Sequence, residues 1–135
     1  MAIQLSDAVR NARLDAIETA VGTSAVLKIR TGAAPANVAT ADSGTVLATL
    51  NLPSDWLAAA SGGSKAKSGT WQDTSADATG TAAHFRIYAS DGTTAHLQGT
   101  VTATGGGGDM TLDNTSIATG QQVTITTFSL TDGNA

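Results

Sequence analysis

The spacing of apolar residues changes near Thr23, and this change constrains the fold more than any other feature of the 135-residue chain. Before Thr23 the apolar residues recur every three or four positions, the period of a helix with one apolar face. After it they alternate with polar residues, the period of a β-strand. The sequence therefore predicts an N-terminal helix or arm over residues 1–22 and a β-sandwich body over residues 23–135, within one domain.

The helix is predicted over about residues 6–21. Ser6 stands at its N-cap position, and Gly22 follows its last turn, where the C′ position favours glycine. The apolar stripe is mostly alanine and buries little area per residue, so we expect the helix to lean on the body or on a neighbouring molecule. The stripe consists of Leu5, Ala8, Val9, Ala12, Ala16 and Ala20.

The body is predicted to hold about seven short strands separated by turn residues. Residues 121–130 change their alternation near Thr126 or Thr127, which indicates either a β-bulge or a strand covered on both faces. Such a series is typical of an antiparallel β-sandwich with jelly-roll or Ig-like strand order. The expected strands lie at residues 25–30 and 46–52, around Trp71, around Phe85, from Ala95 to Val101, and at residues 110–112 and 121–130.

The strands around Phe85 and Leu97 allow a prediction of their pairing. A three-residue loop at residues 90–92, with its glycine in the left-handed position, would pair Ile87 with Ala95 and Phe85 with Leu97. The apolar residues of the two strands would then share one face. The opposite, exposed face of the hairpin would carry His84, Arg86, Tyr88, Thr94, His96 and Gln98.

Six residues form the candidate partner interface. Two arginines flank the stripe of the helix, where they line either a solvated edge or a contact to an acidic partner. The hairpin residues include Tyr and Arg, which are enriched at protein interfaces, although a solvated sheet surface is the alternative. The six residues are Arg10, Arg13, His84, Arg86, Tyr88 and His96.

Composition excludes several classes of function. Seven Lys and Arg against eleven Asp and Glu give a net charge of −4, so the chain lacks the basic surface that neutralises nucleic-acid phosphates. Cysteine is absent, which excludes disulfides, thiolate catalysis and Cys-based zinc sites. The longest apolar stretch, Trp56–Ala60, is too short to cross a bilayer. With no signal peptide evident, we expect a soluble protein made in a cytoplasm, with no nucleic-acid or membrane partner.

No arrangement of residues points to catalysis. His84 and His96 would share a face with Arg86, whose positive charge opposes metal binding there. Residues 64–67 match the S-x-x-K pattern of serine acyl enzymes, but they stand in a Gly/Ser loop without the companion motifs. Glu18 is the one glutamate, and the aspartates are scattered. We therefore predict a non-enzymatic protein with no cofactor and no metal site.

Several stretches, in a consistent order over most of the chain, resemble a group of small structural proteins of tailed bacteriophages. They are residues 8–17, the Gly-Ala-Pro turn after Ile29-Arg30, residues 60–63, 77–82 and 85–87, and the ending Thr131–Ala135. The resemblance implies a protein of the head-decoration or cement type. The group has no catalytic motif to carry over.

What the resemblance implies is a specific set of partners. Proteins of this type bind the outside of an icosahedral shell, so the expected partner is the major capsid protein of a phage, and the expected location is the outer surface of a virion assembled in the host cytoplasm. A repeating lattice also favours a symmetric homo-oligomer, either a dimer or a trimer. Two alternatives stay open: a phage tail or fibre component, and a carbohydrate-binding module that uses Trp56, Trp71 and Tyr88.

Overall fold

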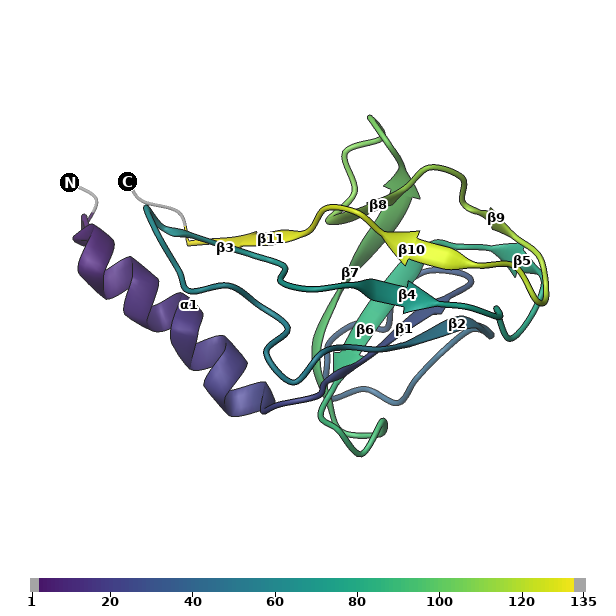
Figure 1. Cartoon of the computed structure of the whole chain (residues 1–135), viewed down its shortest axis with the longest axis horizontal. Helices are drawn as coiled ribbons and strands as arrows, with labels where there is room; N and C mark the ends of the chain where they lie inside the picture. Colours follow the sequence, from purple (N-terminus) through teal and green to yellow (C-terminus); the bar gives the residue numbers. More distant parts are fainter. Residues whose placement is uncertain (1–2, 133–135) are drawn as a thin grey trace.

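The computed structural model describes residues 3–132 and shows a mainly β body with one helix, α1 (Asp7–Val21), at one side. In Figure 1 the helix projects away from most strands and lies beside β3 (Ser64–Ala66) and β11 (Ser129–Thr131). The predicted combination of an N-terminal helix with a mainly β chain is confirmed. The outermost parts of the predicted arm and body, residues 1–2 and 133–135, lie outside the described residues.

The helix has the two ends that its sequence predicts. The Val9 amide donates a hydrogen bond to the Ser6 hydroxyl (3.3 Å), which satisfies one of the free N–H groups of the first turn. At the other end Gly22 has a φ of +92° and donates its N–H to the Glu18 carbonyl (2.9 Å). Glycine adopts this conformation without strain, so the helix ends there.

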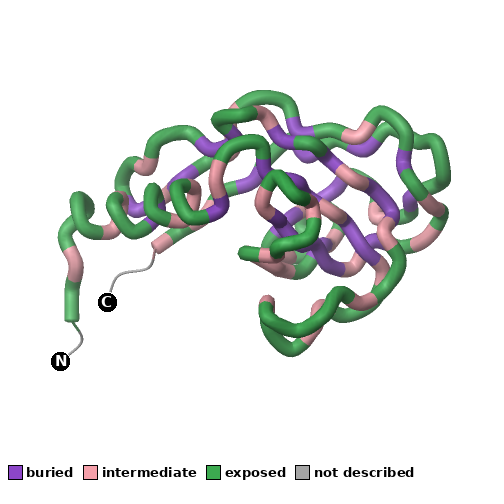
Figure 2. Tube along the Cα trace, turned by 90° about the horizontal axis from the view of Figure 1, so that it is seen from below, coloured by how far each residue is buried: buried purple, intermediate pink, exposed green. Residues whose placement is uncertain are grey.

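The face of α1 that packs on the body is not the predicted one. Leu14 and Val21 are buried and Ile17 is half-buried, at helical spacing along one side. Larger side chains bury more apolar area than alanine does, so this side packs inward and most of α1 is exposed in Figure 2. The residues of the predicted stripe that face solvent are Ala8, Val9, Ala12, Ala16 and Ala20.

Five strands form the main sheet, in the order β2-β1-β6-β7-β8, and three pairs of short strands complete the body. The pairs are β10 with β4, β11 with β3, and β5 with β9. The main-sheet strands are β1 (Val26–Arg30), β2 (Val46–Asn51), β6 (His84–Tyr88), β7 (Ala95–Ala103) and β8 (Met110–Leu112). The remaining strands are β4 (Trp71–Asp73), β5 (Gly80–Thr81), β9 (Ser116–Ile117) and β10 (Val123–Ile125).

The main sheet curls around the apolar core as a half-barrel (Figure 1). The β4–β10 pair lies across its open side, with β4 next to β2 and β10 next to β8. Inside, the Trp71 ring lies between Trp56 and Phe128, with centroid distances of 6.0 and 5.5 Å. The antiparallel-rich β class is confirmed, whereas a β-sandwich with jelly-roll or Ig-like strand order is not.

A glycine-rich loop joins β7 to β8, the one parallel pair among the named strands of residues 3–132. Parallel strands usually need a connection of about a dozen residues or more, but here the chain turns back between Ala103 and Met110. Gly105 and Gly107 have φ angles of +88° and +81°. A Cβ at Gly108 would come within 2.8 Å of the Thr102 hydroxyl oxygen. Glycine therefore allows the chain to fold back this tightly.

The pairing of β6 with β7 differs by two residues from the predicted register. Ile87 lies opposite Leu97, and Phe85 lies opposite Gly99. The Asp91 carboxylate accepts hydrogen bonds from the amides of the two residues that follow Gly92, which lengthens the loop. A Cβ at residue 99 would come within 2.7 Å of the Phe85 ring, so Gly99 makes room for that ring and fixes the register.

The last predicted strand is divided in two at the point where its alternation changes. β10 ends at Ile125 and β11 begins at Ser129. Between them Thr126 and Thr127 are exposed and Phe128 is buried against the core. The change of parity thus marks the place where the chain leaves the β4–β10 pair and joins β3.

Candidate interaction surface

The six residues of the predicted interface lie in three separate places. Arg10 and Arg13 lie on α1, whereas His84, Arg86 and Tyr88 follow one another along one face of β6. The sixth, His96, lies on β7 and is exposed. The structure therefore does not bring the six together into one surface.

The predicted exposed face of β6 is buried, which corrects that prediction. The exposed fractions of His84 and Tyr88 are 0%, and that of Arg86 is 2%. The segment 31–45, which we call the covering loop, supplies hydrogen-bond acceptors to this face: the Gly32 carbonyl lies 2.7 Å from His84 Nδ1, and Arg86 donates to the Thr40 carbonyl (2.9 Å). Because the loop lies over the strand, these residues are not available to a partner.

One carboxylate holds the covering loop to the sheet. Asp42 Oδ2 lies 2.8 Å from an Arg30 nitrogen, and its Oδ1 accepts hydrogen bonds from Arg86 (2.8 Å) and from the Tyr88 hydroxyl (2.7 Å). We call these four residues the Asp42 cluster. Burial raises the pKa of Asp42, but the bonds from Tyr88 and Arg86 outweigh it and hold that pKa below its usual range. Burial and the Asp42 bond raise the pKa of Tyr88.

The helix arginines bind an acidic residue of the same chain. Arg10 donates from Nε and from a terminal nitrogen to the Asp132 carbonyl (2.8 and 2.6 Å), and Arg13 Nε lies 3.3 Å from the Asp132 carboxylate. Both arginines thus contact the residue after β11 within their own chain, and their contact with an acidic partner molecule stays a prediction. The Arg13 side chain keeps 60% of its surface exposed, against 15% for Arg10.

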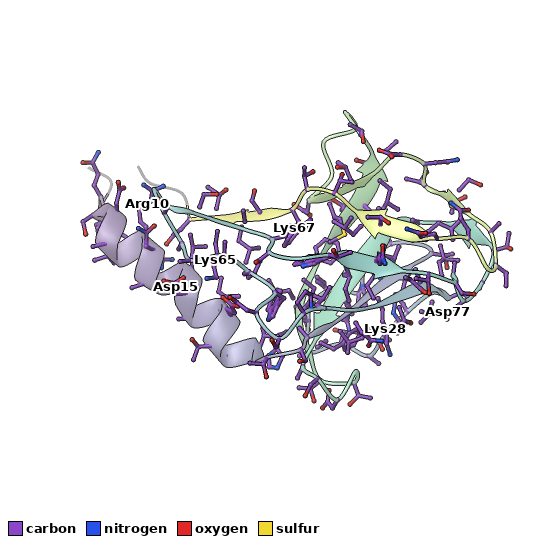
Figure 3. All side chains as sticks on the ribbon, in the orientation of Figure 1. Arg10, Asp15, Lys28, Lys65, Lys67 and Asp77 are labelled. Carbon is purple, nitrogen blue, oxygen red and sulfur yellow. The ribbon has the colours of Figure 1, made fainter. Side chains whose placement is uncertain are left out.

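A buried lysine, absent from the predicted interface, is the main polar contact between helix and body. Only 2% of the Lys65 side chain is exposed, and its Nζ lies 2.7 Å from Asp15, 2.8 Å from Glu18 and 2.9 Å from the Ala58 carbonyl. Figure 3 shows Lys65 and Asp15 between β3 and α1. Burial lowers the pKa of Lys65, but the bonds to the two carboxylates outweigh it and raise that pKa.

Further hydrogen bonds fix the helix along its length. The Gly63 amide donates to Asn11 (2.9 Å), and the Trp56 indole donates to the Gly22 carbonyl (2.9 Å). The sequence carries one signal for this arrangement: Asp15 and Glu18 are three residues apart, so they project on one side of a helix. The helix is therefore held rigidly, with its alanine residues outward.

The exposed side of α1 is the surface best suited to a partner. We call Ala8, Val9, Ala12, Ala16 and Ala20 the alanine face. Val9 is 45% exposed, a high value for a large apolar side chain in this structure. A row of small residues allows another backbone to come close, and it has no charge to desolvate.

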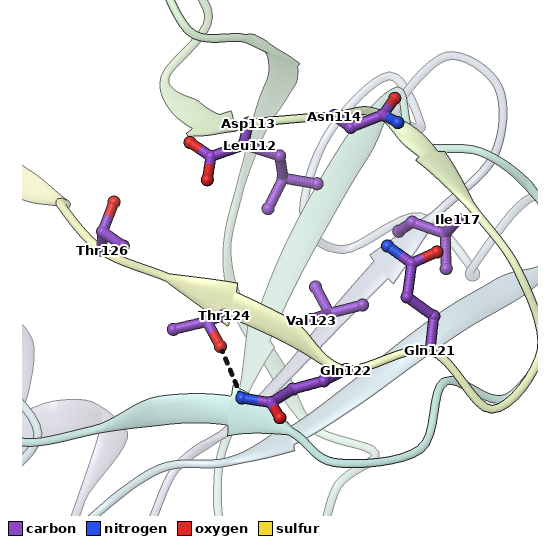
Figure 4. A pocket seen from close by; sticks show the side chains of 9 residues that line it. All are labelled: Leu112, Asp113, Asn114, Ile117, Gln121, Gln122, Val123, Thr124 and Thr126. Atoms are coloured by element: carbon purple, nitrogen blue, oxygen red, sulfur yellow. Dashed lines mark hydrogen bonds between the residues drawn. The ribbon is translucent and has the colours of Figure 1, made fainter.

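The hollows in the surface differ in the ionisable groups that line them: one of about 650 Å³ beside α1 is lined by Asp15, Glu18, Asp55 and Lys65. Figure 4 shows one of about 250 Å³, in which Asp113 is the one ionisable side chain, beside Asn114, Gln121 and Gln122. No nucleophile and base are paired there. Within residues 3–132 no three His, Asp or Glu side chains gather as a metal site, and no helix has the length and apolarity to cross a membrane.

The aromatic residues of the chain do not form a sugar-binding platform. Trp56, Trp71 and Tyr88 are each 0% exposed, and both phenylalanines are also buried. Stacking on a sugar ring needs an exposed aromatic face, so the carbohydrate-binding alternative loses the residues on which it rested.

Comparisons with known proteins do not identify a relative: no family model matches the chain, and neither the curated proteins nor the solved structures contain a match.

Proposed function

We propose that this chain is a non-enzymatic structural protein of a tailed-bacteriophage virion, which binds the outside of the icosahedral capsid and cements neighbouring capsomers. The class comes from the resemblance of several stretches, among them residues 8–17, 60–63, 77–82 and 85–87, to small structural proteins of tailed bacteriophages of the decoration type. One structural observation carries the proposal: the alanine face is exposed on a helix that is already fixed to the body.

A fixed helix suits binding to a rigid shell. Because Lys65, Asn11 and Arg10 hold α1 in place, docking of the alanine face would cost little conformational entropy. Each contact can then be weak, since a symmetric oligomer on a lattice gains affinity from several simultaneous contacts. The major capsid protein is the partner that we propose, with the protein itself as a dimer or trimer.

The binding test uses empty shells of the major capsid protein and two matched variants. Ala12→Glu places a charge in the centre of the alanine face and keeps good helix propensity. Ala118→Glu makes the same change at an exposed residue after β9. We expect Ala12→Glu to bind shells at least about tenfold more weakly, a loss of about 1.4 kcal/mol, and Ala118→Glu to bind normally. Equal binding by both variants would refute docking through α1.

A point substitution is a cleaner test than removal of the helix. Deletion of residues 1–21 should weaken shell binding on the same hypothesis, but it would also uncover Lys65, Trp56 and Leu57. The substituted protein keeps those residues covered, so a binding defect reports the surface itself.

Copy number on purified particles separates decoration from the tail or fibre alternative. Quantitative mass spectrometry should find on the order of one copy per one or few shell subunits if the protein occupies symmetry axes of the lattice. A handful of copies would assign it to the tail or a fibre, and absence from particles would overturn a virion role.

A further inference from the structure

One edge of β11 has no partner strand. Phe128 and Asp132 form backbone hydrogen bonds with the β3 side, to Lys67 and Gly63 (both 2.9 Å). In an antiparallel pair the alternate residues point their N–H and C=O groups the other way, so Ser129 and Thr131 direct theirs outward. Within residues 3–132, β3 is the one strand that pairs with β11.

The first half of β7 also has an unpaired edge. β8 begins its pairing with β7 at Val101, so residues 95–99 have β6 as their one neighbouring strand. The two edges lie on the same side of the half-barrel, because residues 97–98 of β7 and 129–131 of β11 line one hollow. Unpaired edges of this kind are ready templates for an added strand.

A groove with both apolar and polar walls lies between these two edges. It has a volume of about 410 Å³ and is lined by the half-buried Leu97 and Leu130 and the buried Phe85 and Phe128, with Gln98, Asp109, Ser129 and Thr131 as its polar lining. A second hollow of about 330 Å³ continues along the same edge toward Leu14 of α1, and Thr131 lines both. The groove thus follows the free edge of β11, which we call the β11 groove.

The chain itself contains a segment with the chemistry to fill such a groove. Ile3 is 86% exposed, the highest value among the large apolar side chains of residues 3–132. Ile3 and Leu5 alternate with Gln4 and Ser6, so in an extended conformation both apolar side chains lie on one side. Residues 3–6 carry no charged side chain, so their burial desolvates no side-chain charge.

We propose that the β11 groove of one copy accepts residues 3–6 of a second copy as an added β-strand. Ser129 and Thr131 would supply backbone hydrogen bonds, and the groove would bind the side chains of Ile3 and Leu5. In known cases of strand addition, the backbone bonds give affinity and the side-chain pockets give specificity. Four extended residues span about 13 Å, enough to cover the three residues of β11.

The exchange builds a closed oligomer. We call residues 3–6 the exchanged arm. Two copies that exchange these arms reciprocally form a dimer with twofold symmetry, and copies that each pass the arm to the next copy form a ring. This inference rests on the proposed function, which includes a dimer or trimer, and it names the surface through which the copies would associate. Its test uses the isolated protein without shells, so a failure here leaves binding to the capsid intact.

The absence of cysteine allows a direct test by disulfide formation between chains. An Ile3→Cys chain is mixed with an isotopically heavy Ser129→Cys chain and oxidised mildly. We expect at least about tenfold more mixed disulfide than with a heavy Thr119→Cys chain, because docking raises the effective concentration of the two thiols. Equal yields would overturn the proposal. A double Ile3→Cys/Ser129→Cys chain that closes on itself as a monomer would also overturn it.

Sedimentation equilibrium with two further variants tests the groove and the arm separately. Ser129→Pro removes an outward N–H and leaves the bonds to β3, since proline is tolerated at such edge positions. Ile3→Asp places a charge on the arm, whereas Ile3→Val keeps its apolar character. We expect the first two variants to associate at least about tenfold more weakly, and Ile3→Val to match the wild type.

Two results would refute the arm exchange. One is a wild-type protein that stays monomeric at concentrations of hundreds of micromolar. The other is an oligomer that Ile3→Asp leaves unchanged. Because Ile3 is exposed and outside α1, this variant folds whether or not Ser129→Pro does, so the proposal stays falsifiable.

Discussion

The body and the helix of this protein are held by different forces. The body surrounds a core of apolar side chains, among them Leu27, Ile29 and Trp71, which are 0% exposed. The helix contributes the buried Leu14 and Val21 and the half-buried Ile17, and it depends further on hydrogen bonds and ion pairs. Apolar burial supplies most folding energy, whereas each hydrogen bond adds about 1 kcal/mol net.

This difference implies that α1 can open while the body stays folded. Local opening has a lower free energy where few apolar contacts are lost. The helix should therefore exchange its amide hydrogens at a lower free energy than β1 does.

The largest expected effect comes from one change made in both regions. Leu27→Ala removes a large side chain from the centre of the main sheet and should cost about 4 kcal/mol, whereas Leu14→Ala should cost about 2 kcal/mol, the low end for a buried leucine, because a hollow already borders Leu14. Urea denaturation measures both. Equal losses would show that the helix belongs to the same cooperative core.

The next effect concerns the Asp42 cluster. Asp42→Ala leaves two buried guanidinium groups, of Arg30 and Arg86, without their carboxylate, and should cost about 2–3 kcal/mol. The covering loop should then be cut by proteases well before the body. Asp113→Ala, at an exposed carboxylate on another loop, is the matched control and should leave stability within about 0.5 kcal/mol.

Acid should weaken the same cluster. The pKa of Asp42 in the folded protein lies below the value of the unfolded chain, about 3.9, because the bonds from Tyr88 and Arg86 outweigh the effect of burial. The ionised Asp42 carboxylate therefore stabilises the folded protein fully above about pH 4. This stabilisation is lost as the pH falls through the pKa that Asp42 has in the folded protein. The Tm difference between wild type and Asp42→Asn should shrink below about pH 4. A constant difference down to about pH 2 would contradict this assignment.

The smallest effect concerns the helix contact. Lys65→Met keeps the length of the side chain but loses its charge, and should cost about 1–2 kcal/mol, since Asp15 and Glu18 can regain water. The hydrogen bond from Lys65 lowers the pKa of Asp15, so this substitution should raise that pKa toward its ordinary value, as followed by NMR titration. Lys67→Met, at a less buried lysine two residues away, should leave the pKa of Asp15 unchanged.

Local features of the sequence predict much of the fold. The caps at Ser6 and Gly22 define α1 because they act within one turn of the chain. The alternation of residues 26–30 and 46–51 likewise defines β1 and β2. Even the division of the last strand follows from its change of parity near Thr126.

The failures concern contacts between distant segments. The register of β6 and β7 depends on Gly99 opposite Phe85, and the burial of Arg86 depends on Asp42, 44 residues away. Which side of α1 faces the body depends on Lys65, which binds Asp15 and Glu18. Periodicity reports which face of an element is apolar, but it does not report which segment will cover a polar face. For this reason the candidate interface moved from β6 to the outer side of α1.

The bond between Arg10 and Asp132 joins residues 122 positions apart, and this separation bears on how the protein is made. A ribosome adds about 5–20 residues per second, so Asp132 follows Arg10 by on the order of ten seconds. During that interval α1 lacks its contact with Asp132 after β11 and, at first, also its contact with Lys65 of β3. Among the elements of residues 3–132, α1 is thus synthesised first and is among the last to reach its final place.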